Sequence, residues 1–167
     1  MSRAPLWLPV LGLILVLTAA NYTIRQRQHI VERGQAVLLD LRPVDPRSLM
    51  QGDYMALRYS DSAFPQTSEK SGLPRRGAFI VELDERNVAT FSRADDGREL
   101  AANEVRLKYK QVDSSGRIRL GAESFFFEEG QAPQFVNARY GVLHVDAAGN
   151  SVLIGLADAD GRVISPD

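Results

Sequence analysis

The sequence predicts a mainly β domain that follows an N-terminal transmembrane helix. An uncharged apolar run occupies residues 5–24, and short β-rich runs separated by Gly, Asp, Asn and Pro fill the chain beyond it. The length of 167 residues favours one compact domain. We therefore divide the chain into a tail (1–4), a transmembrane anchor (5–24), a helical extension or linker (25–34) and a mainly β domain (35–167).

The anchor is predicted from its length and its ends. A helix needs about 20 apolar residues to span the hydrocarbon core of a bilayer, and residues 5–24 carry no charge. Trp7 and Tyr22 stand near the two ends, where interfacial aromatic side chains are typical. Two alternatives stay open: a cleaved signal peptide ending in the small residues 18–20, and a buried core helix.

Nine short runs rich in β-branched and aromatic residues predict strands. They are 36–41, 54–59, 78–83, 88–92, 104–109, 117–120, 124–127, 141–145 and 151–156. Turn residues at 84–87, 114–116 and 147–150 indicate hairpins, so we expect an antiparallel sandwich or barrel. The polar stretch 60–76, with two prolines, is expected to be a long exposed loop, and one short helix is expected over 132–139.

The composition excludes several classes of function. The net charge of -1 gives no electrostatic footprint for nucleic acid. Zero cysteines remove disulfide scaffolds, thiol nucleophiles and zinc fingers. The two histidines, His29 and His144, lie far apart in the chain, and we find no phosphate loop or dinucleotide motif. The sequence therefore predicts no cofactor, no metal and no nucleic-acid partner.

Residues 43–59 predict one helical turn followed by a strand. Pro46 suits the first position of the turn, Gly52 can end it, and the Asp53 carboxylate can accept hydrogen bonds from turn amides. The strand alternates between two faces, with Met55, Leu57 and Tyr59 on one and Tyr54, Ala56 and Arg58 on the other. One face is expected to be apolar and the other to present polar groups.

The string GDYMALRY at residues 52–59 resembles the GDYXXLXY family. It matches the five named positions of that pattern at Gly52, Asp53, Tyr54, Leu57 and Tyr59. The resemblance continues through residues 125–131, 138–141 and 155–162. It implies a bacterial protein with an N-terminal hydrophobic segment, often found with multi-spanning membrane proteins. No activity or catalytic residue comes with the resemblance.

Ten residues are the candidate motif or binding residues, and none is assigned a catalytic role. They are Arg47, Gly52, Asp53, Tyr54, Leu57, Arg58, Tyr59, Glu128, Glu129 and Tyr140. The two glutamates follow three phenylalanines, and a carboxylate beside apolar surface can act as a general acid. The alternative is a solvated turn before the next helix. Phe125 and Phe127 share one strand face and Phe126 takes the other, which indicates burial on both sides or an apolar partner surface.

The functional expectation is a membrane-anchored extracytoplasmic module, acting in binding or as an accessory subunit of a membrane protein complex. Its expected partners are the lipid bilayer, through residues 5–24, and an integral membrane protein. The expected location is the inner membrane of a bacterium, with a single pass and a periplasmic C-terminal domain. The alternative is a membrane-tethered hydrolase of peptide or cell-envelope material that uses carboxylates or Ser48, although the chain supplies few lysines as a base for that serine.

Overall fold

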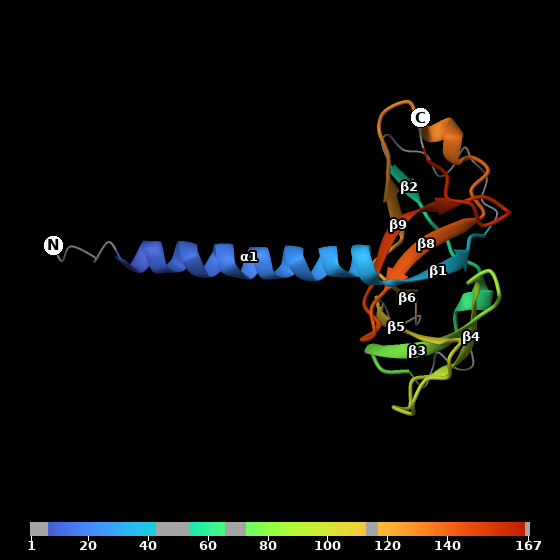
Figure 1. Ribbon diagram of the computed structural model, residues 1–167, viewed down its shortest axis with the longest axis horizontal. Helices are drawn as coiled ribbons and strands as arrows, with labels where there is room; N and C mark the ends of the chain where they lie inside the picture. The colour runs from blue at the N-terminus through green and yellow to red at the C-terminus, as the bar shows by residue number, and fades with distance from the viewer. Residues whose placement is uncertain (1–6, 43–53, 66–72, 113–116, 166–167) are drawn as a thin grey trace.

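A long helix leads into a β-rich body (Figure 1). The computed structural model describes residues 7–42, 54–65, 73–112 and 117–165. The helix, α1 (Trp7–Arg33), has 27 residues, which at about 1.5 Å each gives a length of about 40 Å. It projects away from the body, and only its C-terminal end lies against the sheets. The sequence predicts that residues 5–24 cross a bilayer. Among the described residues, however, no helix combines the length and the hydropathy that a membrane crossing requires.

The end of α1 is fixed to the body by a close junction at Gly34. The Gly34 amide donates to the Ile30 carbonyl at 2.8 Å, and Ile30 itself is buried. A Cβ atom at Gly34 would lie 2.4 Å from the Ile30 oxygen and 2.9 Å from the Cβ of His144, so only glycine fits. The His144 Nδ1 donates to the Val31 carbonyl at 2.7 Å, and Arg27 donates to the Ser151 carbonyl at 3.4 Å.

The described part of the body holds nine strands, one in each predicted run. They are β1 (Gln35–Asp40), β2 (Tyr54–Ala56), β3 (Arg76–Leu83), β4 (Ala89–Ala94), β5 (Glu104–Gln111), β6 (Ile118–Arg119), β7 (Ser124–Phe126), β8 (Tyr140–Val145) and β9 (Ser151–Ala157). They form a three-stranded sheet β1-β8-β9, a four-stranded sheet β4-β3-β5-β6 and a two-stranded ribbon β2-β7. Every strand pair is antiparallel, which confirms the predicted mainly β, antiparallel class.

The predicted hairpins at 84–87 and 147–150 join β3 to β4 and β8 to β9. The strands β5 and β6 also pair, although the turn at 114–116 lies outside the described residues. In both described turns an aspartate side chain organises the reversal. The Asp84 carboxylate accepts from the amides of Arg86 and Val88 at 2.8 Å, and the Asp146 carboxylate accepts from the Asn150 amide at 2.8 Å.

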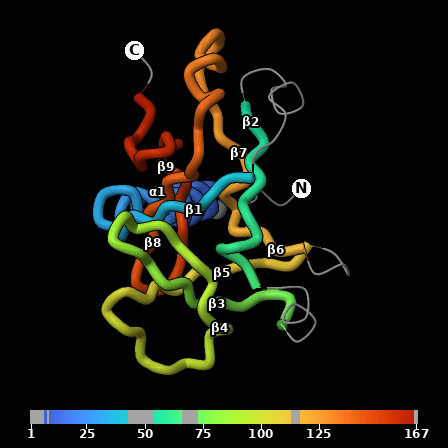
Figure 2. Tube along the Cα trace, turned by 90° about the vertical axis from the view of Figure 1, so that its right-hand side faces the viewer, coloured from blue at the N-terminus to red at the C-terminus, as the bar shows by residue number. Residues whose placement is uncertain are grey.

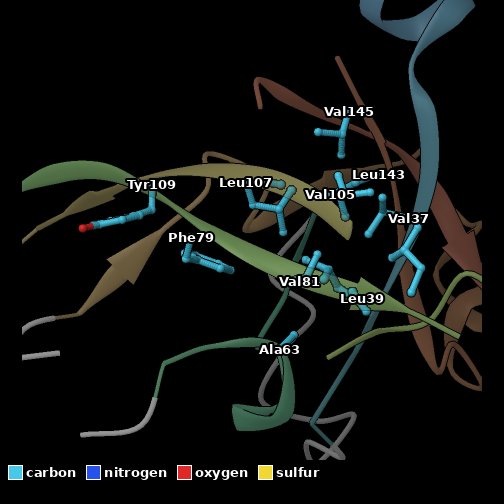
Figure 3. Packing of buried hydrophobic residues seen from close by; sticks show 13 residues of the cluster. Val37, Leu39, Ala63, Phe79, Val81, Val105, Leu107, Tyr109, Leu143 and Val145 are labelled. Carbon is cyan, nitrogen blue, oxygen red and sulfur yellow. The ribbon is translucent and has the colours of Figure 1, made fainter. Parts of the chain in front are cut away.

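The main hydrophobic core lies between the three-stranded and four-stranded sheets. Figure 3 shows Phe79 and Val81 of β3 and Leu107 of β5 opposite Val37 of β1 and Leu143 of β8, and all five are fully buried. These side chains recur at every second position of their strands, as a half-buried strand requires. The burial of this alternating face against the opposite sheet is what holds the two sheets together.

A second core lies between the three-stranded sheet and the β2-β7 ribbon. Its buried members are Leu41, Met55, Leu57, Phe135 and Leu156. In Figure 2 the three-stranded sheet lies between the β2-β7 ribbon and the four-stranded sheet, so it serves both cores. The strand β2 of this ribbon holds Tyr54, Met55 and Ala56 of the sequence motif, and residues 57–59 follow it directly.

Two local expectations hold only in part. The stretch 60–76 is not exposed throughout, because a 3-10 helix, η1 (Asp61–Ala63), begins within it and buries Ala63, and Pro65 is buried as well. Ring contacts with the core, among them Phe64 to Phe79 at 5.8 Å, hold this segment in place. The helix expected over 132–139 is the single 3-10 turn η2 (Ala132–Phe135), which has no side-chain cap at Gln131.

Candidate functional site

The motif strand has the two faces that its sequence predicts. Met55 and Leu57 are buried in the second core, whereas Tyr54 and Arg58 are exposed. Backbone hydrogen bonds continue the pairing beyond β2, since the Leu57 amide donates to the Glu123 carbonyl at 2.8 Å. Leu57 is therefore a packing residue. The alternation predicts both its burial and the exposure of its neighbours.

Tyr59, the last residue of the motif, connects the two cores. Its ring packs against buried residues of both hydrophobic clusters and lies 6.1 Å from the ring of Phe64. Its hydroxyl donates to the Ala122 carbonyl. Burial, with a smaller effect of the Glu123 charge, raises the pKa of Tyr59 far above the usual value for tyrosine. A hydroxyl that stays neutral and donates to a buried carbonyl has a structural role. Tyr59 is therefore a packing residue that joins the two hydrophobic cores.

Tyr140 is next to Gly141, which contacts Tyr59, but the Tyr140 side chain packs on the opposite face of the three-stranded sheet. A Cβ atom at the adjacent Gly141 would lie 3.0 Å from the Tyr59 ring, so the glycine permits close packing there. The Tyr140 ring carries the guanidinium of Arg86 at 5.9 Å from its centroid. The same Arg86 side chain donates to the Ala159 carbonyl at 2.7 Å and thus connects the β3-β4 turn to the turn that follows β9.

The outer face of the β2-β7 ribbon carries an exposed aromatic pair. Tyr54 and Phe126 are directly opposite each other in the antiparallel register, with ring centroids 5.9 Å apart. Phe126 is 73% exposed and Tyr54 is 37% exposed. Phe125 and Phe127, by contrast, pack on Phe135 in the second core. Of the two readings of the triple phenylalanine, core packing holds for two residues and the apolar surface for the third.

The glutamates form a turn and do not approach the motif strand through any described contact. Glu128 and Glu129 are both exposed, and the Glu128 carboxylate accepts from the Gln131 side chain at 3.4 Å. The Gln131 amide donates to the Glu128 carbonyl at 3.1 Å, which closes the turn before η2. Of the two interpretations of these glutamates, the solvated turn before the next helix therefore describes the segment.

Three candidate residues, Arg47, Gly52 and Asp53, lie outside the described residues, and so does Ser48 of the hydrolase alternative. Lys108, one of the few lysines, is exposed and donates to the Asn150 side chain at 3.2 Å. Across the described stretches, no group of three or more His, Cys, Asp or Glu side chains is arranged to hold a metal ion.

One feature has no counterpart in the predicted site. A hollow of about 330 Å³ lies where the end of α1 meets the start of β1, β5 and the β8-β9 turn, and His29, Arg33 and Arg106 are among its lining residues. The sequence contained a signal for it, because Arg25, His29 and Arg33 follow one another at intervals of four, the spacing of one helix face.

Comparisons with known proteins identify one relationship. The family model described as GDYXXLXY protein matches residues 16–156, which is most of the chain. No curated protein and no solved structure matches the chain. The match starts within α1 and ends within β9, so it includes the last two thirds of the helix as well as the motif strand.

Proposed function

Because the chain belongs to the GDYXXLXY family, we propose that it is a membrane-anchored interaction module that serves as an accessory subunit of an integral membrane protein. The observation that carries the proposal is the uncovered apolar surface of α1. Ten large apolar side chains of α1 are more than half exposed: Trp7, Val10, Leu11, Leu13, Ile14, Leu15, Val16, Leu17, Tyr22 and Ile24. They surround the helix on all sides, which is typical of a helix that is buried by something other than its own body.

Transfer of the apolar side chains of α1 out of water releases a large free energy. Removing one Val, Leu or Ile side chain from water stabilises by about 1.5–3 kcal/mol. The aliphatic side chains of α1 together provide a driving force on the order of 10 kcal/mol for transfer out of water. A surface of this size is not left in water by a stable protein, and a lipid bilayer covers a single helix on every side.

The polar groups of the same stretch suit an apolar environment. The Thr18 hydroxyl donates to the Ile14 carbonyl at 2.7 Å, and the Thr23 hydroxyl donates to the Ala19 carbonyl at 2.9 Å. The side-chain amide of Asn21 donates to the Leu17 carbonyl at 2.9 Å. An unpaired polar group in hydrocarbon costs several kcal/mol, so these internal hydrogen bonds let three polar residues accompany the apolar ones into a bilayer.

The body presents the contact surface in this proposal. The pair of Tyr54 and Phe126 exposes two aromatic rings on the ribbon that carries the family motif. Aromatic residues are enriched among those that dominate binding energy at protein interfaces. The expected occupant is an extramembrane loop of the integral membrane protein, and the expected setting is the periplasmic side of a bacterial inner membrane.

The test is co-purification from a bacterial membrane with full-length tagged protein and gentle detergent. We expect a stoichiometric membrane protein with the wild type, and its loss with Phe126→Ser while circular dichroism shows a folded body. Val112→Ser is the matched control, since Val112 is 48% exposed on a different part of the body. If Phe126→Ser and Val112→Ser retain the partner equally, the aromatic pair is not the contact surface. A wild type that purifies alone contradicts the subunit role.

A further inference from the structure

The hollow at the end of α1 combines a cationic rim with an aliphatic wall. Its volume is about 330 Å³, and its lining includes His29, Arg33, Glu104, Arg106 and Asp146 as polar groups, with Val105 among the aliphatic ones. It opens at the junction of helix and body, beside the closely packed glycine that ends α1. The charged side chains around it decide which kind of ligand it can take.

The acidic residues of the lining already have partners. Glu104 forms an ion pair with Arg93 at 3.1 Å, and the Asp146 carboxylate accepts from the side-chain amide of Asn150 at 2.8 Å. Arg106 is likewise engaged, since its Nε lies 2.7 Å from an Asp95 oxygen. The acceptor groups of the hollow are therefore largely satisfied from within the protein.

The two basic side chains that α1 contributes to the lining, those of His29 and Arg33, are not engaged in this way. Within the described residues, the side chains of His29 and Arg33 make no hydrogen bond and no ion pair. Both residues are exposed. An unpaired guanidinium on the rim of a hollow offers donors arranged as a planar fork, which matches the oxygens of a phosphate better than a lysine does. The ligand that this arrangement favours is an anion.

The positions of the basic residues along α1 indicate the source of that anion. Arg25, His29 and Arg33 lie on one face of α1, and Arg25 is the first charged residue after the apolar stretch. At about 1.5 Å per residue, His29 stands about 8 Å and Arg33 about 14 Å beyond Ile24. The Cα–Cβ bonds of a helix tilt toward its N-terminus, so these side chains lean toward the apolar stretch and the lipid headgroups next to it.

We infer that this hollow binds the phosphate of an anionic phospholipid headgroup, with Arg33 and His29 as its ligands and Arg25 on the path of entry. The inference rests on the proposed membrane anchoring. Clusters of basic residues beside a membrane helix attract anionic lipids, with about 1 kcal/mol for each Lys or Arg near the surface. The bound lipid holds the body at a fixed orientation to the bilayer, because the site spans both α1 and the sheets.

The experiment measures lipid retention by the full chain in nanodiscs. The discs contain phosphatidylcholine alone or phosphatidylcholine with phosphatidylglycerol, and the lipids that stay bound after mild detergent washing are counted by native mass spectrometry. We expect the wild type to retain phosphatidylglycerol in preference to phosphatidylcholine. Arg33→Gln reduces this preference about fivefold, which corresponds to ~1 kcal/mol, and His29→Gln reduces it in the same direction. Arg162→Gln is the control, since it also removes one positive charge from an exposed position, in the turn after β9.

Three results overturn the inference. One is equal retention of the two lipids by the wild type, and another is equal loss in Arg33→Gln and Arg162→Gln. The third is release of phosphatidylglycerol by millimolar inorganic phosphate, which identifies a site for free phosphate. Quenching of Trp7 fluorescence by brominated lipid in the same discs separates the two proposals. If Trp7 is quenched and no lipid preference exists, only this inference fails. If Trp7 is not quenched, the membrane anchoring fails with it.

Discussion

Replacing Tyr59 by phenylalanine removes one buried hydroxyl and keeps the ring. The Ala122 carbonyl loses its donor, and Ala122 is only 2% exposed, so solvent cannot replace the tyrosine. An unsatisfied buried acceptor costs about 1–3 kcal/mol. The ring contacts with Phe64 and with both cores remain. We expect Tyr59→Phe to lower the free energy of unfolding by about 1–2 kcal/mol near pH 8.

The same hydroxyl predicts how this difference changes with pH. Burial raises the pKa of Tyr59 far above the value of about 10 that tyrosine has in an unfolded chain. Above pH 10 the unfolded wild type therefore loses a proton that the folded wild type keeps, and each pH unit lowers its stability by about 1.4 kcal/mol. The variant has no such proton. The destabilisation by Tyr59→Phe should thus shrink by about 1.4 kcal/mol between pH 8 and pH 11.

The assay is urea unfolding of the full chain in detergent, followed by near-ultraviolet circular dichroism at pH 8, 10 and 11. Tyr54→Phe is the control, because the Tyr54 side chain is exposed and has no hydrogen bond within the described part of the chain. It should change stability little at any of these pH values. A difference between wild type and Tyr59→Phe that stays constant from pH 8 to pH 11 would refute the reasoning, since the hydroxyl would then ionise as easily in the folded state as in the unfolded one.

Three further predictions concern the packing of Gly34 at the end of α1, the hydrogen bond of Arg86 and the stability of the protein in acid. Gly34→Ala should destabilise by about 1–3 kcal/mol through overpacking, whereas Gly12→Ala, with nothing within 4 Å of the added Cβ, should not destabilise in thermal unfolding. Arg86→Met should cost about 1 kcal/mol through its lost hydrogen bond, and an unchanged melting temperature contradicts this. A hydrogen bond from Arg106 holds the pKa of Asp95 below its usual range. The ionised Asp95 carboxylate therefore stabilises the fold above about pH 4, and this stabilisation is lost as the pH falls. The free energy of unfolding of Asp95→Asn should decrease less in acid than that of the wild type. Parallel plots of the free energy of unfolding against pH for the two proteins contradict this.

The strands could be predicted because their signal is local. A short run rich in β-branched and aromatic residues and bounded by turn residues identifies a strand without knowledge of its partners, and each of the nine runs contains a strand. The buried segment after the motif could not be predicted in this way. Ala63 belongs to the main core, Pro65 is also buried, and Phe64 between them contacts Phe79, although this sequence has the composition of an exposed loop.

The site was only partly predictable for the same reason. The exposure of Tyr54 follows from the alternation in its strand, but its pairing with Phe126 depends on which strands are neighbours. The role of Tyr59 depends on the Ala122 carbonyl, 63 positions away in the chain. The spacing of His29 and Arg33 is visible in the sequence, whereas the hollow beside them exists only where β5 and the β8-β9 turn meet the helix.

The most direct test of the central claim uses the single tryptophan of the chain, Trp7, which lies at the start of α1 and is 62% exposed within the protein. Full-length protein is reconstituted in vesicles, and its tryptophan emission is measured with lipids brominated in the acyl chains and, separately, with acrylamide in the water. Membrane anchoring predicts strong quenching by the brominated lipids and weak quenching by acrylamide. Efficient quenching by acrylamide together with none by brominated lipid would contradict the claim that the apolar stretch of α1 is covered by a bilayer.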